Sequence, residues 1–72
     1  MVTLFGTSAC HLCELAEALL AQRGMAFEHV DISESDELFE RYGTTIPVLR
    51  REDGAELNWP FDQEMLAAFL KP

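Results

Sequence analysis

The chain has 72 residues, of which 13 are acidic and 5 are basic, so its formal charge is −8. This balance argues against binding to nucleic acid, whose phosphates require basic patches, and against binding to an anionic membrane surface. No apolar run approaches the roughly 20 residues of a transmembrane helix. The length predicts a single domain over 1–72.

Two strands separated by an amphipathic helix are predicted in the first half of the chain. The apolar run at 2–5, which ends at Gly6, is too short for a helix and favours a buried strand. Apolar residues then recur at spacings of three and four, which predicts a helix over 10–23 that Gly24 closes. A second strand is predicted at 27–32. The helix residues predicted to face the core are Leu12, Leu15, Ala16, Leu19 and Leu20.

A shorter helix is predicted after the second strand. Ser33 or Ser35 can cap its N-terminus, and acidic residues in the first turn suit the positive end of the helix dipole. The helix is predicted to run through Tyr42, with Gly43 as its C-terminal cap. Its apolar stripe consists of Leu38, Phe39 and Tyr42.

A β-hairpin and a last helix are predicted at the C-terminal end. A third strand is expected at 46–51 and a fourth at 55–58, antiparallel to the third. Asp53 and Gly54 between them are a strong signal for a two-residue turn. The last helix is expected to begin near Asp62.

The order of these elements is β-α-β-α-β-β-α. A helix between the first two strands requires a right-handed crossover, which makes those strands parallel. The last two strands form an antiparallel hairpin. The chain is therefore predicted to be an α/β protein with a four-stranded mixed sheet and three helices.

The two cysteines, Cys10 and Cys13, are three residues apart. Closing so short a loop constrains the unfolded chain very little, so the pair does not serve as a structural staple. The first residues lack the basic start and long apolar run of a signal peptide, so we expect a cytoplasmic protein. In that reducing compartment a Cys-x-x-Cys pair is more often catalytic or metal-binding than structural.

This order, with Cys-x-x-Cys at the junction of the first strand and first helix, resembles the thioredoxin superfamily. The segment 5–13 is similar to the strand, loop and active-site turn of glutaredoxins, and 42–49 is similar to the segment that carries the superfamily's cis-proline. The chain also resembles small glutaredoxin-like bacterial proteins with a Trp-Pro-Phe segment, which lies here at 59–61. The resemblance implies a thioredoxin-like fold and a thiol–disulfide oxidoreductase that reduces protein or small-molecule disulfides.

Cys10 is the predicted nucleophile and Cys13 the predicted resolving thiol. Cys10 is expected at a helix N-terminus, where unpaired N–H groups and the helix dipole favour a thiolate. Cys13, one turn further, is then placed to break the mixed disulfide at Cys10 and release the reduced target. His11 is a third candidate catalytic residue, because a protonated imidazole stabilises a neighbouring thiolate. The alternative for His11 is a side chain that only faces solvent.

The resemblance also implies a substrate-binding loop. Pro47 corresponds to the cis-proline that faces the cysteines, and the backbone of Ile46 would pair with bound peptide or glutathione. Thr45 and Trp59 complete the predicted substrate-binding set, although Trp59 and Phe61 are equally well explained as core or edge cover. The structural alternative for Pro47 is an ordinary proline that begins a strand.

Two departures from glutaredoxins bear on the electron donor. Thr7 stands where glutaredoxins often have a lysine, and Asn58-Trp59-Pro60 stands where they have a Gly-Gly pair that helps hold glutathione. We therefore expect no bound cofactor, and glutathione and thioredoxin reductase remain alternative sources of electrons. A monomer acting on a disulfide-containing protein or on glutathione is the expected arrangement.

Three other interpretations use the same residues. A thioredoxin-fold adaptor that binds without catalysis is the alternative function. A zinc site at Cys10 and Cys13, with His11 or His29, lacks the second ligand pair that structural zinc requires. An iron–sulfur cluster shared across a dimer usually needs glutathione as a ligand. No metal site is therefore expected.

His29 and Asp31 should share one face of the strand at 27–32, where a carboxylate near the cysteines can relay protons. A turn residue is the favoured interpretation of Asp31, and a partly exposed side chain that of His29. Tyr42 is expected to serve packing only.

Overall fold

The computed structural model describes residues 1–71. Its elements follow the β-α-β-α-β-β-α order that the sequence predicts, with one additional 3₁₀ turn. In chain order they are β1 (Val2–Gly6), α1 (His11–Gln22), β2 (Phe27–Asp31), the 3₁₀ turn η1 (Ile32–Glu34), α2 (Asp36–Tyr42), β3 (Val48–Arg50), β4 (Glu56–Asn58) and α3 (Gln63–Leu70).

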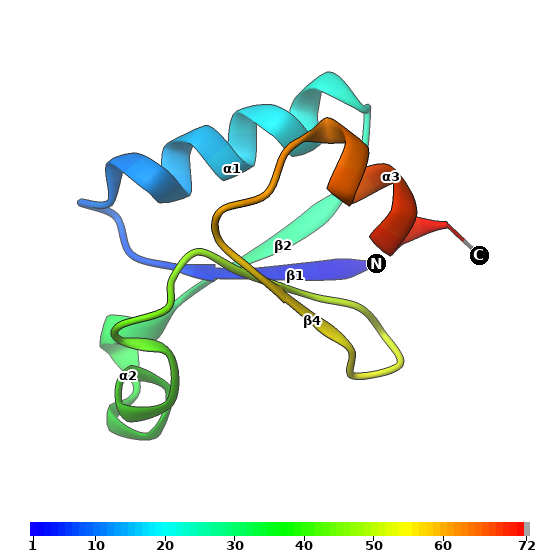
Figure 1. Cartoon of the computed structure of the whole chain (residues 1–72). Coiled ribbons are helices and arrows are strands. Elements are labelled where there is room, and N and C mark those ends of the chain that lie inside the picture. The colour runs from blue at the N-terminus through cyan, green and yellow to red at the C-terminus, as the bar shows by residue number, and fades with distance from the viewer. Residues whose placement is uncertain (72) are drawn as a thin grey trace.

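The four strands form one mixed sheet in the order β2-β1-β3-β4. β1 is parallel to β2 and antiparallel to β3, and β3 is antiparallel to β4. Figure 1 shows α1 and α3 on one face of this sheet and α2 on the other. The predicted thioredoxin-like architecture is therefore confirmed.

The alternation of side chains along β1 divides the core into two clusters. Leu4 faces α1 and α3 and packs with Ala16, Leu20 and Leu66. Phe5, the next residue, points to the opposite face, toward α2. The second cluster consists of Phe5, Ile32, Tyr42 and Val48. Because successive side chains of a strand alternate between faces, β1 contributes Val2 and Leu4 to the first cluster and Phe5 to the second.

α1 begins and ends where the sequence predicts, with Cys10 as its N-cap and Arg23 as its C-cap. Gly24 has a φ of +67°. Its N–H donates to the carbonyl of Ala21, and the N–H of Met25 donates to that of Leu20. This pair of bonds is a Schellman motif, which requires a left-handed residue that glycine adopts without strain.

The expectation that Leu12 and Leu15 face the core is wrong. Leu12 is 43% exposed and Leu15 is 42% exposed. The buried stripe of the helix runs through Cys13, Ala16 and Leu20. Each of the two exposed leucines lies one residue before a buried one, which turns it by about 100° around the helix axis.

The segment between β2 and α2 differs slightly from its prediction. β2 ends at Asp31, and Ile32 begins η1 because the Asp31 carboxylate accepts hydrogen bonds from the backbone N–H of Ser33 at 2.9 Å and from its hydroxyl at 2.7 Å. Of the two candidate caps, Ser35 caps α2, through a 3.3 Å bond from the N–H of Leu38.

Gly43 is the C-terminal cap of α2, as predicted, but glycine is needed there for a close approach and not for a left-handed backbone. Gly43 has a φ of −55°, which is ordinary helical backbone. A Cβ at this position would lie 2.5 Å from the carbonyl oxygen of Phe39, so glycine permits a close approach of the chain. The Phe39 side chain is 56% exposed, so its assignment to the apolar stripe is wrong.

The hairpin has a longer turn than Asp53-Gly54 predicts. The N–H of Arg51 donates to the carbonyl of Ala55, which leaves three residues in the loop, and Gly54 has a φ of +93°. A three-residue hairpin loop places its left-handed residue last, which is where Gly54 stands. β3 and β4 are also shorter than predicted, covering Val48–Arg50 and Glu56–Asn58.

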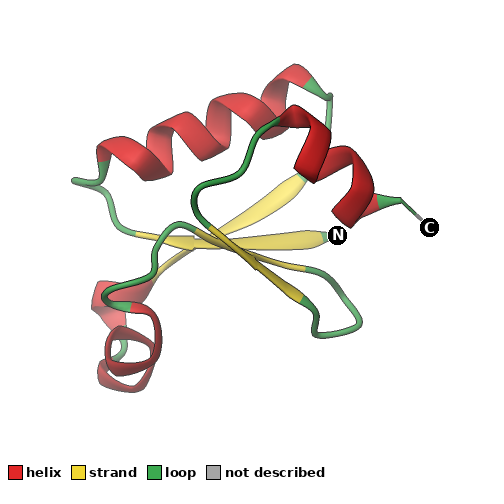
Figure 2. Cartoon of the chain, viewed as in Figure 1, coloured by secondary structure: helices red, strands yellow, loops and turns green. Residues whose placement is uncertain are grey.

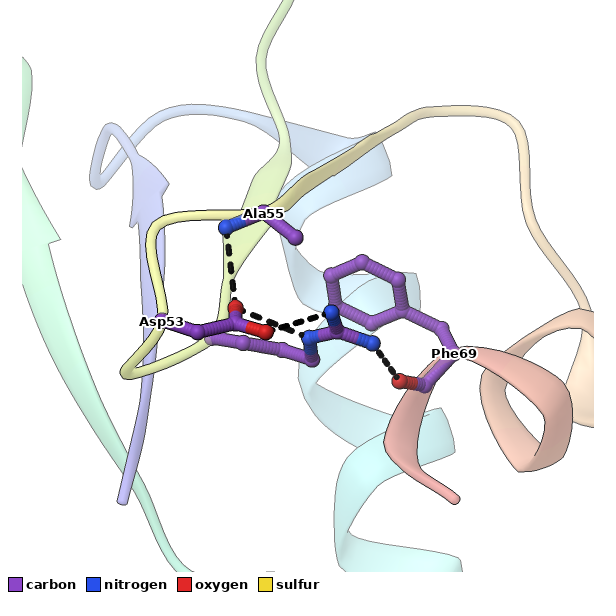
Figure 3. A network of polar contacts seen from close by, with 4 residues as sticks. Asp53, Ala55 and Phe69 are labelled. Atoms are coloured by element: carbon purple, nitrogen blue, oxygen red, sulfur yellow. Dashed lines mark hydrogen bonds and ion pairs between the residues drawn. The ribbon is translucent and has the colours of Figure 1, made fainter. Parts of the chain in front are cut away.

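Arg51 ties this hairpin to α3 (Figure 3). Its guanidinium donates to the Asp53 carboxylate through Nε at 3.1 Å and Nη2 at 2.6 Å, and to the carbonyl of Phe69 through Nη1 at 2.8 Å. It also lies 4.8 Å from the centre of the Phe69 ring. Asp53 accepts a further bond from the N–H of Ala55 at 3.0 Å. The Arg51 guanidinium and the Ala55 N–H lower the pKa of Asp53.

Candidate functional site

The register of the sheet gathers four chain segments at one end. Gly6, the last residue of β1, pairs with Asp31 at the end of β2. Phe5 pairs with Val48, so Pro47, the residue before Val48, lies at the same end of the sheet. The carbonyl of Pro47 accepts a 3.1 Å hydrogen bond from the N–H of Trp59. Figure 2 shows the loops that enter α1, β3 and α3 at this end of the sheet. The site is therefore assembled by strand pairing between distant parts of the chain.

Cys10 occupies the N-cap of α1 and forms a disulfide with Cys13. The Cα atoms of the two residues are 5.2 Å apart. The backbone N–H of Cys13 donates a hydrogen bond to Cys10 Sγ at 3.1 Å. A helix N-terminus leaves its first N–H groups without carbonyl partners, and these groups stabilise an anion. The Cys10 sulfur thus occupies the position that favours a thiolate.

The two cysteines differ in their access to solvent. Cys13 is 1% exposed, whereas Cys10 is partly exposed. Cys13 packs against Gly6 so closely that a Cβ on Gly6 would lie 2.7 Å from Cys13 Sγ. An external disulfide can therefore approach Cys10, while Cys13 is shielded behind it.

His11 lies on the outer surface of α1. Its side chain is 80% exposed, and Nδ1 is 3.7 Å from a carboxylate oxygen of Glu14. Within residues 1–71 it makes no hydrogen bond to either cysteine sulfur. An effect of His11 on the Cys10 thiolate would therefore act through space.

Thr45, Ile46 and Pro47 form the loop that enters β3. The Ile46–Pro47 peptide bond is cis, and so is Trp59–Pro60, which the sequence analysis did not anticipate. The N–H groups of Thr45 and Ile46 both donate to the carbonyl of Tyr42, at 3.0 and 3.1 Å. The Thr45 hydroxyl makes a 3.4 Å bond to the same carbonyl. The loop is thus held against the end of α2.

Trp59 and Phe61 follow β4 and differ in burial. Phe61 is 4% exposed and belongs to the core cluster under α1 and α3, so core packing is the correct interpretation for it. Trp59 is half-buried and contacts Phe61 edge to face, with ring centres 5.0 Å apart. Of the two aromatic residues, only Trp59 keeps substantial surface in contact with solvent, and its N–H donates to the carbonyl of Pro47.

Tyr42 serves packing, as expected, and also makes a polar contact. Its ring stacks on Phe5 with centres 4.5 Å apart, and its hydroxyl donates to Glu56 at 2.5 Å. Burial raises the pKa of the Tyr42 hydroxyl, and the bond to Glu56 raises it further. Asp31 caps η1, which matches its interpretation as a turn residue. The two bonds from Ser33 lower the pKa of Asp31, and His29 nearby lowers it further.

The sequence analysis gave no role to Gly6 and only a minor one to His29. A Cβ on Gly6 would meet both Cys13 Sγ, at 2.7 Å, and His29 Nε2, at 3.6 Å. The sequence shows a glycine directly before the cysteine loop and a histidine in the neighbouring strand. Neither residue indicates that Gly6, Cys13 and His29 lie next to one another. This placement depends on how far α1 sits above β1 and β2.

Comparison with known proteins places the chain among glutaredoxin-like domains. The family model described as "Glutaredoxin-like domain (DUF836)" matches residues 1–71. No curated protein matches the chain. Within residues 1–71, no helix has the length and hydropathy to cross a membrane.

Several solved structures are similar to this one. The structural genomics target protein XcR50 from X. campestris is 45% identical and has a TM-score of 0.92, with 97% of this chain and 95% of that chain covered. Protein Ne2328 from Nitrosomonas europaea is 26% identical, with a TM-score of 0.73 and coverage of 97% and 89%. A glutaredoxin from Archaeoglobus fulgidus, 20% identical, has a TM-score of 0.71 and coverage of 99% and 86%, which shows a shared fold.

The Cys-x-x-Cys pair at the start of α1 and the match to the family model together fit a redox role. The family match extends over 71 of the 72 residues. The chain therefore belongs to the glutaredoxin-like domain family.

Proposed function

We propose that this protein is a dithiol–disulfide oxidoreductase that reduces protein or small-molecule disulfides through Cys10 and Cys13. The observation that carries the proposal is the position of Cys10 Sγ at the N-cap of α1, 3.1 Å from the backbone N–H of Cys13. A helix N-terminus stabilises a thiolate, and the thiolate is the form that attacks a disulfide.

The proposed reaction has two exchanges. The Cys10 thiolate attacks one sulfur of the target disulfide, forms a mixed disulfide and expels the first target thiolate. The Cys13 sulfur then attacks Cys10 Sγ, forms the Cys10–Cys13 disulfide and expels the second target thiolate. The protein dithiol loses two electrons and the target gains them, with one proton passing to each released thiolate. The greater exposure of Cys10 supports this division of roles.

Substrate binding is proposed at Thr45, Ile46, Pro47 and Trp59. The bond from Ile46 N–H to Tyr42 leaves the Ile46 carbonyl as the group for pairing with an extended peptide. Within residues 1–71 that carbonyl accepts no hydrogen bond. Trp59, beside Pro47, supplies an apolar surface for the substrate.

His11 is proposed to favour the thiolate when its imidazole is protonated. Glu14, whose carboxylate lies 3.7 Å from Nδ1, carries a negative charge that itself opposes thiolate formation at Cys10. The protein is proposed to act as a cytoplasmic monomer without a bound cofactor. Glutathione as co-substrate and thioredoxin reductase are the two proposed sources of electrons.

An equilibrium titration in glutathione redox buffers tests the proposal. Samples are quenched by alkylation, and the mass of the protein reports the fraction of Cys10–Cys13 disulfide. We expect a reversible transition with a potential in the range of roughly −180 to −270 mV that redoxins cover. Cys10→Ser and Cys13→Ser are the controls, because neither can form the intramolecular bond.

The competing adaptor function predicts a different result. A pair that stays reduced in strongly oxidising buffer, or that forms only bonds between chains, would leave binding as the function. If the transition is reversible, turnover of a protein disulfide with either glutathione or thioredoxin reductase and NADPH identifies the donor.

A further inference from the structure

His29 and the resolving cysteine, Cys13, both lie next to Gly6 at the end of β1. The position that a Gly6 Cβ would occupy is 2.7 Å from Cys13 Sγ and 3.6 Å from His29 Nε2. Both atoms therefore border the same small space above Gly6, which has no side chain to separate them. The strand register explains this placement, because His29 pairs with Leu4 and shares with Gly6 the face of the sheet that α1 covers.

We infer that His29 is the proton acceptor for Cys13 when the mixed disulfide at Cys10 is resolved. This inference rests on the proposed function. Cys13 is 1% exposed, and burial disfavours the thiolate that must attack Cys10 Sγ. At 1% exposure the sulfur has little access to water, so a neighbouring base speeds removal of the proton. An imidazole exchanges protons near neutral pH and suits this role.

His29 must also release the proton to solvent, and its exposure allows this. β2 is an edge strand, and the His29 side chain is exposed although its Nε2 lies beside the space over Gly6. Nε2 borders the space that Cys13 Sγ also borders, and the residue as a whole is exposed to solvent. Histidine can therefore pass the proton from Cys13 to water, which a fully buried base cannot do.

The step balances in atoms and charge. The proton of the Cys13 thiol moves to His29 Nε2, and the Cys13 sulfur forms a bond to Cys10 Sγ. The bond between Cys10 and the target sulfur breaks, and the target leaves as a thiolate. The imidazolium then releases its proton to solvent, from which the target thiolate is protonated.

Two carboxylates lie on the elements that carry Cys13 and His29. Asp31 follows His29 on the same face of β2 and interacts with its charge. Glu17 lies one turn after Cys13 on the same side of α1 and is half-buried. β1 contributes no titratable side chain between Val2 and Gly6. Asp31 stabilises the imidazolium that forms when Cys13 is deprotonated, because its carboxylate interacts with the His29 charge.

Stopped-flow reaction of the reduced protein with dithiobis(nitrobenzoate) separates the two exchanges. Attack by Cys10 releases one nitrothiobenzoate at a rate proportional to reagent concentration. Attack by Cys13 releases the second at a rate independent of that concentration. For His29→Gln we expect an unchanged first phase and, at neutral pH, a second phase slowed by about ten- to a hundredfold.

The pH dependence distinguishes a proton acceptor from a residue that only supports packing. In His29→Gln the second phase should rise steadily with pH and reach the wild-type rate in alkaline buffer, where hydroxide removes the proton directly. Glu28→Gln, an exposed residue beside His29, is the matched control and should leave both phases unchanged.

An unchanged second phase in His29→Gln, or one slowed by the same factor at every pH, would overturn the inference. Neither result bears on the proposed function, which in this experiment fails if the wild-type protein shows no second phase.

Discussion

The backbone N–H of Cys13 donates a hydrogen bond to Cys10 Sγ across 3.1 Å, so the amide of the buried cysteine supports the sulfur of the accessible one. The bond comes from the main chain, and it is retained when the Cys13 side chain is changed. Cys13→Ser therefore isolates the Cys10 thiol in its own environment. Cys10→Ser isolates Cys13, which lies one turn inside the helix and is 1% exposed.

We predict that Cys10 in Cys13→Ser reacts with iodoacetamide at neutral pH about ten times faster than Cys13 does in Cys10→Ser, or faster still. The thiolate at a helix N-terminus is favoured, and the buried sulfur is neither ionised nor accessible. The rates are measured by mass spectrometry of quenched samples. In denaturing urea the two variants should react alike, and a difference that persisted there would show that the fold is not its cause.

Gly6→Ala is predicted to destabilise the reduced protein by about 1–3 kcal/mol, as overpacking in a core does. The added Cβ would lie 2.7 Å from Cys13 Sγ and 3.2 Å from Cys13 Cβ, so β1 and α1 must separate. Gly6 has a negative φ, so the cost comes from contact and not from backbone strain. Urea denaturation gives the free energy of unfolding.

A double-mutant cycle attributes this cost to the sulfur. In a Cys13→Ala background the nearest atom is removed, and Gly6→Ala should cost less by about 0.5 kcal/mol or more. Equal costs in the two backgrounds would mean that another neighbour of Gly6 is responsible.

Much of the fold follows from local patterns in the sequence. The strand at 2–5, the helix that Gly24 closes and the Cys-x-x-Cys pair between them were predictable because each depends on a few adjacent residues. The role of Cys10 as N-cap was predictable for the same reason. Element boundaries were less accurate where a side chain competes with the sheet, as Asp31 does when it caps η1.

The contact of Gly6 with Cys13 and His29 was not predictable. It depends on the parallel register of β1 and β2 and on the height of α1 above them, which residues in three separate elements determine. The prediction of a two-residue turn at Asp53-Gly54 was wrong for a similar reason. The pairing of Arg51 with Ala55 fixes the loop length, and Arg51 is held by α3.

The stability of α1 should depend on Leu20 far more than on Leu15. Leu20 is fully buried on the face of α1 that packs against the sheet. Leu20→Ala is expected to lower the free energy of unfolding by about 2–5 kcal/mol. Leu15 is 42% exposed, so Leu15→Ala removes much less buried surface and should cost less than about 1 kcal/mol. Chemical denaturation of both variants provides the comparison, since the same substitution in the same helix cancels differences in helix propensity. Similar losses would contradict the burial pattern found for this helix.

The Arg51–Asp53 pair should make part of the stability depend on acid pH. The Arg51 guanidinium lowers the pKa of Asp53 in the folded protein, whereas in the unfolded chain the carboxyl keeps its ordinary value of 3.8. The folded state therefore binds this proton more weakly than the unfolded state. The stabilisation is complete above the ordinary pKa and is lost as the pH falls through the lowered one.

Asp53→Asn keeps an oxygen for the Ala55 N–H but removes the charge that pairs with Arg51. We expect the variant to be less stable than the wild type from neutral pH down to about pH 4, and the difference should narrow below that value as the wild type becomes protonated. Thermal unfolding followed across this range measures the difference. Glu40→Gln removes an exposed carboxylate from α2 and serves as the control. If the difference in stability between Asp53→Asn and the wild type stays constant down to the lowest pH, the ion pair is not the cause of that difference.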